Sequence, residues 1–247
     1  GTTFFAGLHS SQESISKSLD YISSAVEKSG IRAIIAYAAS ERHTHAEGAR
    51  GMKENIRFLE KNSKSLESRV NGMVGFGCTF TASDELLRHA DRVSKRFDVP
   101  IALSVSEGKL DLYHSLENYG KRPVERLRDL GILKSNTVLG HCVHLNDDEI
   151  SLIKKSDSKV AHCPMSNMLN ATGVAPVPKM IENNITVGIG NDGYIFDKFE
   201  NLRSFYLIHK TMTGDPRSTS PMQALEMATI EGAKLYGMEN EIGSIEP

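Results

Sequence analysis

Residues 137–164, which read TVLGHCVHLNDDEISLIKKSDSKVAHCP, decide the fold. The stretches 137–143 and 159–164 are short apolar runs, typical of strands that are buried on both faces. Between them, residues 147–155 place apolar side chains at helical spacing, after Asn146 and a run of acidic residues that together are typical of a helix start. A strand, a helix and a second strand in this order predict a βαβ unit with parallel strands.

The same alternation runs along the whole chain of 247 residues. The runs with the character of buried strands are 2–7, 31–39, 73–78, 101–106, 137–143, 159–164 and 186–190. Helical spacing is found at 16–29, 49–61, 83–97, 124–130, 147–155 and 178–183. Because no linker or low-complexity segment interrupts this pattern, we expect residues 1–247 to form a single, incomplete barrel domain.

Seven strands alternating with helices fit either an open doubly wound sheet or a barrel that is one strand short. A doubly wound nucleotide-binding sheet typically has a glycine fingerprint after its first strand. The segment that follows Gly7 reads LHSS, and no GxxxxGK[ST] motif occurs in the chain. The sequence therefore favours an α/β fold of the (β/α)₈ TIM-like barrel class, with the first strand missing. The strands at 2–7 and 186–190 would then have open edges, so we expect another element or a second copy of the chain to cover them.

Composition narrows the classes of partner. The net charge is -2, with 29 basic and 31 acidic residues, which gives no reason to expect nucleic acid or an anionic membrane. Apolar runs such as 31–39 are far shorter than the ~20 residues of a membrane helix, and residues 1–9 lack the basic start of a signal peptide. The three cysteines form no CxxC pair. A reducing cytoplasm fits this cysteine pattern best. We also expect the protein to form a homo-oligomer and to bind a small molecule.

Polar residues end several of the predicted strands. His9, Glu107, His141 and Asp192 each follow an apolar run. In parallel barrels the active site lies at these carboxyl ends, and histidines with carboxylates suit a divalent metal ion or acid–base chemistry.

Each of these residues also has a structural interpretation. His9, and His162 inside its apolar run, could be ordinary structural histidines, and Asp192 before Gly193 could form an Asx-turn. Glu107 could equally cap the helix that follows it. The pair His43 and His45 lies beyond its strand in a polar segment, which favours a solvated loop outside any metal site.

Several short motifs occur in a fixed order along the chain. They are Tyr119–Val124 (YGKRPV), Gly140–Leu145 (GHCVHL), His162–Asn167 (HCPMSN), Val174–Pro178 (VAPVP), Gly190–Gly193 (GNDG) with Phe199–Arg203 (FENLR), and Gly243–Pro247 (GSIEP). Together they resemble the cytosine-deaminase/chlorohydrolase branch of the metal-dependent amidohydrolase superfamily, which includes deaminases of guanine and of adenosine-type compounds and hydrolases of triazines.

The resemblance implies a hydrolase that uses water activated by one zinc or iron ion. The bond cleaved would be a C–N bond (deamination) or a C–Cl bond of a purine, pyrimidine or triazine-like ring. Carried over by position, Glu107 is the proton shuttle, His141 polarises and binds the substrate, and Asp192 is a metal ligand and base. Asn167 is carried over as a second substrate-binding residue. The resemblance thus implies that Glu107, His141 and Asp192 face one cavity, with their side chains within roughly 10 Å of one another.

The chain departs from the branch at two positions. Ser104, three residues before Glu107, stands where the branch has a metal-binding histidine, and Gly77 stands where it has a substrate-binding histidine. The branch's HxH pair on the first strand and its terminal β-sandwich have no counterpart here, so we expect an excerpt of a longer protein or a degenerate homologue. With Asp192 the one inherited ligand, we expect the metal ion to be absent or weakly bound, unless His9 and His141 complete a replacement site.

Three hypotheses of function stay open on the sequence alone. The first is a hydrolase in the full-length parent. The second is a catalytically silent homologue that binds a ligand or serves as an oligomer subunit. The third is a metal-free enzyme that uses Glu107 and His141 as an acid–base pair.

Overall fold

The computed structural model of the chain describes residues 2–62 and 69–246. The chain divides into two compact units. Unit 1 comprises residues 1–103 and 130–132, and unit 2 comprises residues 104–129 and 133–247. The expected single domain over 1–247 stays a prediction.

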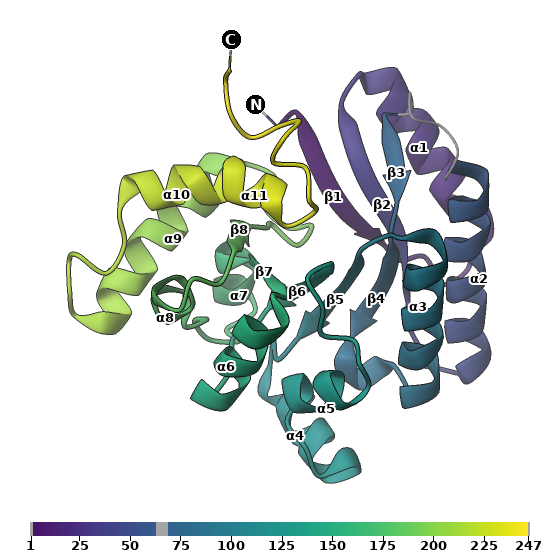
Figure 1. Cartoon of the computed structure of the whole chain (residues 1–247), viewed down its shortest axis with the longest axis horizontal. Helices are drawn as coiled ribbons and strands as arrows, with labels where there is room; N and C mark the ends of the chain where they lie inside the picture. Colours follow the sequence, from purple (N-terminus) through teal and green to yellow (C-terminus); the bar gives the residue numbers. More distant parts are fainter. Residues whose placement is uncertain (1, 63–68, 247) are drawn as a thin grey trace. The chain divides into compact units, whose positions relative to one another are not determined.

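Unit 1 is built on parallel strands whose order follows the sequence. They are β1 (Phe4–His9), β2 (Arg32–Ala39), β3 (Val70–Gly72), β4 (Val74–Cys78) and the first part of β5 (Ile101–Val105). β2 is buried over seven of its eight residues and pairs in parallel with β1, β3 and β4. The helices α1 (Ser18–Ser29), α2 (His45–Asn62) and α3 (Asp84–Phe97) pack on these strands, and a short 3₁₀ turn, η1 (Thr79–Thr81), follows β4 (Figure 1).

Unit 2 continues the pattern with the end of β5 followed by β6 (Thr137–His141), β7 (Lys159–His162) and β8 (Val187–Ile189). β6 pairs with β7 and β7 with β8, both in parallel. The helices of this unit are α4 (Lys109–Tyr119), α5 (Pro123–Asp129), α6 (Asp147–Ser156), α7 (Pro164–Leu169), α8 (Val177–Glu182), α9 (Lys198–Thr213), α10 (Pro221–Ala228) and α11 (Ile230–Lys234). α10 and α11 pack on β8, and α7 packs on α9 (Figure 1).

Apart from β3, which pairs with β2 off this path, the strands of each unit follow one another in chain order, as in a (β/α)₈ barrel. Within residues 2–62 and 69–246, neither unit contains the reversal of strand order that defines a doubly wound sheet. Among the described residues, β1 pairs with β2 alone and β8 with β7 alone. The predicted element or second copy that covers these edges stays a prediction.

Strand ends differ from the predictions for identifiable reasons. The run 137–143 is a strand only to His141, because His141 and Cys142 adopt left-handed conformations with φ of 67° and 53°. The run 159–164 ends at His162, because Pro164 begins α7. α2 begins at His45, four residues before the predicted helix, since the Thr44 hydroxyl caps it by accepting from the Glu47 amide at 3.2 Å.

The short strand β3, the 3₁₀ turn η1 and the helices α4, α7, α9, α10 and α11 were not among the predicted elements. α4 begins after Gly108, which has no side chain to mark a helix start. Its apolar residues Leu110 and Tyr113 are exposed, so its sequence lacks a clear separation between a buried and a solvated face. No helix within the described ranges is both long and apolar enough to cross a membrane.

Candidate active site

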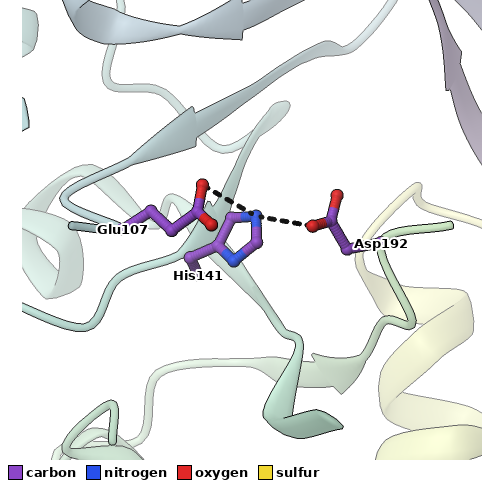
Figure 2. Close-up of side chains that lie close together, drawn as sticks. All are labelled: Glu107, His141 and Asp192. Carbon is purple, nitrogen blue, oxygen red and sulfur yellow. Dashed lines mark ion pairs between the residues drawn. The ribbon is translucent and has the colours of Figure 1, made fainter. Parts of the chain in front are cut away.

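Glu107, His141 and Asp192 come together in unit 2, with the imidazole of His141 between the two carboxylates (Figure 2). Nε2 of His141 lies 3.7 Å from Oε2 of Glu107 and 3.8 Å from Oδ2 of Asp192. One ligand atom from each residue lies within 4.8 Å of the other two. The predicted proximity of these three side chains is therefore confirmed.

Each of the three residues lies at or just beyond the end of a parallel strand, at a tight backbone turn. His141 and Asp192 have φ of 67° and 50°, and Ser106, the residue before Glu107, has φ of 50°. This left-handed conformation is uncommon for residues with a side chain, and such strain concentrates at functional sites. Hydrogen bonds hold the turns in place, since the amide of Cys142 donates to the Val105 carbonyl at 3.0 Å and that of Val143 to the Ser106 carbonyl at 3.0 Å.

The side chains differ in exposure. That of His141 is 3% exposed, compared with 23% for Glu107 and 38% for Asp192. The two carboxylates are therefore accessible to solvent or a ligand, whereas the imidazole is buried and has a hydrogen-bond partner at Nδ1. Nδ1 of His141 lies 2.8 Å from Oδ1 of the buried Asn167. Because a carbonyl oxygen can only accept, Nδ1 carries a proton and Nε2 is the atom directed at the carboxylates.

Asp192 has a partner that the sequence did not reveal. The hydroxyl of Ser166 donates to Oδ2 of Asp192 at 2.7 Å, and Ser166 is fully buried. Ser166 precedes Asn167 in the motif His162–Asn167, so the motif contained the residue but gave no indication of its partner. The predicted substrate-binding residue Asn167 is 1% exposed, and this role stays a prediction.

The donor set of the three residues fits a divalent metal ion. Ligands on a tetrahedral zinc ion at ~2.0–2.2 Å lie about 3.4 Å from one another. The distances of 3.7 and 3.8 Å from His141 Nε2 to the carboxylate oxygens are close to that spacing. Metal-binding histidines also typically donate their second ring N–H to a fixed acceptor, which Asn167 provides here.

The nearby thiols do not add to this donor set. Burial raises the pKa of Cys163 to about 12, with a further contribution from the charge of Asp192. Burial also raises the pKa of Cys142 well above its ordinary value. Neither thiol belongs to the group of ligand atoms that the described residues Glu107, His141 and Asp192 form.

Comparison with known proteins identifies the family. The sequence profile described as "Amidohydrolase family" matches residues 1–247. The chain belongs to the amidohydrolase family. It is 36% identical over 250 residues to a 5'-deoxyadenosine deaminase of Methanobrevibacter smithii, covering 100% of this chain and 56% of the relative. It is 36% identical over 234 residues to a 5-methylthioadenosine/S-adenosylhomocysteine deaminase of Syntrophomonas wolfei, covering 93% of this chain and 54% of the relative.

The solved structures confirm the fold class. A zinc-bound adenosine deaminase from Xanthomonas campestris superposes with a TM-score of 0.91 at 23% identity, covering 100% of this chain and 55% of that chain. This amidohydrolase chain therefore has the fold of part of a (β/α)₈ barrel. It spans a little over half the length of the curated relatives that it matches.

His162, another predicted candidate in this amidohydrolase chain, is not part of the group of ligand atoms that Glu107, His141 and Asp192 form. His162 is buried, and its ring centroid lies 5.4 Å from that of His209 and 6.1 Å from that of Phe205. Burial lowers the pKa of His162 well below its ordinary value, and the charges of His209 and His141 lower it further. Its surroundings are those of a packed, neutral histidine of the core.

His9 and His45 both lie in unit 1. The ring of His9 meets Tyr37 edge-on, with centroids 5.9 Å apart, and burial lowers its pKa. His45 is exposed and lies 2.9 Å from Glu41, which raises its pKa through a hydrogen bond and through charge. The idea that His9 completes a replacement metal site stays a prediction.

The two positions at which the resemblance predicts a missing histidine are on strands. Ser104 lies in β5, half-buried, and Gly77 lies in β4. A Cβ atom at Gly77 would meet Oγ1 of Thr81 at 3.5 Å, which is an ordinary contact. There is space for a Cβ atom here, so crowding alone does not require glycine at this position.

Proposed function

We propose that this chain carries the catalytic site of a hydrolase that removes the amino group from a purine ring, with 5'-modified adenosines as substrates. The observation that supports it is the cluster of Glu107, His141 and Asp192, in which one imidazole lies within 3.8 Å of two carboxylates at the ends of parallel strands. Replacement of an amino group by water needs groups that take a proton from water and give one to the leaving nitrogen. A carboxylate beside an imidazole supplies both.

The exposure of each side chain supports a division of roles. Glu107 is partly exposed and can exchange protons with a substrate, so we assign it the proton shuttle. His141 is held at Nδ1 by Asn167, so its Nε2 is the atom that holds or moves a proton beside the carbon under attack. Asp192, the most exposed of the three, takes the proton of the attacking water.

Asp192 would also hold a divalent ion, with Glu107 and His141 close by in the proton-transfer roles given above. When bound, such an ion supplies a water that ionises near neutral pH. The zinc reported for the Xanthomonas campestris adenosine deaminase suggests which ion to test first. Which metal this chain binds, and how tightly, are part of the proposal.

Deamination is favoured over C–Cl hydrolysis because both curated relatives described above are named as deaminases of adenosine derivatives. Both names describe adenosine derivatives, in which a 6-aminopurine is joined to a ribose that is modified at its 5' position. The cytoplasmic location, the homo-oligomer and the lack of nucleic-acid or membrane partners stay predictions.

A catalytically silent homologue is the second candidate, and Ser104 supports it. This serine lies on β5 where the resemblance predicts a metal-binding histidine, and a neutral hydroxyl is a poor zinc ligand. A silent homologue would bind an adenosine derivative without converting it.

A substrate panel separates the two candidates. The full-length protein that contains this chain is incubated with 5'-deoxyadenosine, 5'-methylthioadenosine, S-adenosylhomocysteine, guanine and a chlorotriazine, with added zinc. We expect ammonia and the corresponding hypoxanthine derivative from one or more of the adenosine compounds, and no chloride from the triazine. Binding of these compounds by calorimetry without release of ammonia would contradict the enzyme and support the silent homologue.

A further inference from the structure

Two consecutive residues of α7 hold two of the three side chains of the proposed site. Ser166 Oγ donates to Asp192 Oδ2 at 2.7 Å, and Asn167 Oδ1 accepts from His141 Nδ1 at 2.8 Å. Each bond joins residues that are 26 positions apart. The first reaches Asp192, which follows β8, and the second reaches His141, at the end of β6. One turn of helix after β7 therefore connects the ends of both neighbouring strands.

We propose that Ser166 and Asn167 are positioning residues, which set the orientation of Asp192 and the tautomer of His141; this inference rests on the function proposed above. Neither residue is exposed by more than 1% of its surface. Each acts through the side chain that it holds and makes no contact of its own with the reacting atoms.

Asn167 determines which nitrogen of His141 is available for chemistry. A neutral imidazole has one N–H and one lone pair, and the hydrogen bond to a carbonyl oxygen places the N–H at Nδ1. Nε2, which lies 3.7 Å from Glu107 Oε2, is then free to accept a proton. Without an acceptor at Asn167, the ring could rotate or exchange its proton to Nε2.

Ser166 determines which oxygen of Asp192 faces His141. The Ser166 hydroxyl has a single proton, and its oxygen accepts from Asn170 Nδ2 at 3.5 Å. The Ser166 proton is therefore directed at Oδ2 of Asp192, the oxygen that lies 3.8 Å from His141 Nε2.

The backbone of α7 is itself held in place. The Asn167 amide donates to the Cys163 carbonyl at 3.0 Å, and the Thr172 amide donates to the Asn167 carbonyl at 3.0 Å. Groups that are held by a rigid, buried element keep their geometry better than groups that are held by a loop. A shift of α7 would disturb Asp192 and His141 together.

The structure favours positioning over direct contact of Asn167 with substrate. Asn167 is almost fully buried, and its one acceptor oxygen is taken by His141. Loss of a substrate contact raises KM, whereas loss of positioning lowers kcat with KM unchanged. The two roles are therefore separable by kinetics.

The experiment uses the full-length protein with Asn167→Leu, which removes the acceptor, Asn167→Asp, which keeps it, and Ser166→Ala. Asn183→Leu and Ser151→Ala are controls for the same substitutions at exposed positions, where Asn183 Nδ2 and Ser151 Oγ each donate only to a backbone carbonyl four residues earlier. The first measurement is ¹⁵N NMR of histidine side chains in substrate-free protein, with His141 assigned through a His141→Gln variant. The second is steady-state deamination.

We expect His141 to carry its proton on Nδ1 in the native protein and in Asn167→Asp, and to lose this state in Asn167→Leu. We expect kcat to fall roughly 10–100-fold in Asn167→Leu and Ser166→Ala, with KM unchanged and rescue by Asn167→Asp. An Nε2–H tautomer in the native protein would overturn the proposal, as would a rise in KM alone. The NMR result needs no turnover, so it decides the proposal even if the purine assay fails.

Discussion

Nε2 of His141 lies 3.7 Å from Oε2 of Glu107, although the two residues are separated by α4 and α5 along the chain. The ends of β5 and β6 bring them together, because parallel strands that are neighbours in a sheet end at the same edge. A partly exposed carboxylate beside a buried imidazole is an arrangement for proton transfer, and it can be tested one residue at a time.

Glu107→Gln removes the carboxylate and keeps the size of the side chain. If Glu107 shuttles protons, kcat falls by roughly 10²–10⁴-fold, which is the usual contribution of general acid–base catalysis. Thermal unfolding should be nearly unchanged, because Glu107 is partly exposed. Glu117→Gln on the exposed side of α4 is the control. A Glu107→Gln variant with the kcat of the native protein would exclude Glu107 as the shuttle.

Asp192→Asn tests the metal-binding role of Asp192. An amide has no charge and binds a divalent ion more weakly than a carboxylate, so the variant should retain less zinc or iron after dialysis. The metal content per chain is measured by mass spectrometry, with the exposed Asp148→Asn as the control. Equal metal content in the native protein and in Asp192→Asn would show that this carboxylate does not hold the ion.

Arg122→Ala should destabilise unit 2. Nε of Arg122 donates to Oε2 of the fully buried Glu149 at 2.7 Å, and its Nη2 donates to the His144 carbonyl at 2.6 Å. Removing one partner leaves the Glu149 charge buried, so the free energy of unfolding should fall by roughly 3–5 kcal/mol. Urea unfolding measures this.

The exposed pair of Arg217 and Asp215 provides the comparison for Arg122. Arg217→Ala should leave the urea midpoint almost unchanged, since both side chains are already solvated. Equal effects of the two substitutions would mean that burial of Glu149 does not determine the strength of its ion pair.

Acid should destabilise the chain through its buried histidines. Burial lowers the pKa of His209 from 6.5 to about 4 and that of His162 well below 6.5. Below pH 6.5 the unfolded chain binds protons at these residues and the folded chain does not, so stability is full above pH 6.5 and falls toward pH 4.

His209→Leu removes one of these titrating groups. The loss in free energy of unfolding between about pH 7 and about pH 5 should become smaller by up to about 2 kcal/mol. Urea unfolding at the two pH values gives the difference. An unchanged loss in the variant would contradict a neutral, buried His209.

The sequence predicted the strands well for a physical reason. A strand such as β2 is buried on both faces, so its residues form a continuous apolar run that is visible without a structure. The helix α4 was missed because Leu110 and Tyr113 are exposed, and helix prediction depends on a separation of apolar and polar faces. Its position after Glu107 is what a (β/α) repeat requires.

The site was predictable in part. The position of Glu107, His141 and Asp192 at strand ends, together with the family motifs, was enough to expect them together. The bonds from Ser166 to Asp192 and from Asn167 to His141 were not predictable, because each joins residues 26 positions apart and depends on where α7 begins. That start is set by Pro164, which the predicted strand 159–164 still includes.

Deamination in ¹⁸O-labelled water tests the central claim most directly. The full-length protein is incubated with 5'-deoxyadenosine in labelled water, and the purine product is analysed by mass spectrometry beside a parallel sample of Asp192→Asn. If the cluster of Glu107, His141 and Asp192 activates water, the native protein forms a hypoxanthine product with one ¹⁸O atom and one ammonia per turnover, and the variant forms far less. Unchanged substrate, or a deaminated product without ¹⁸O, would contradict the account.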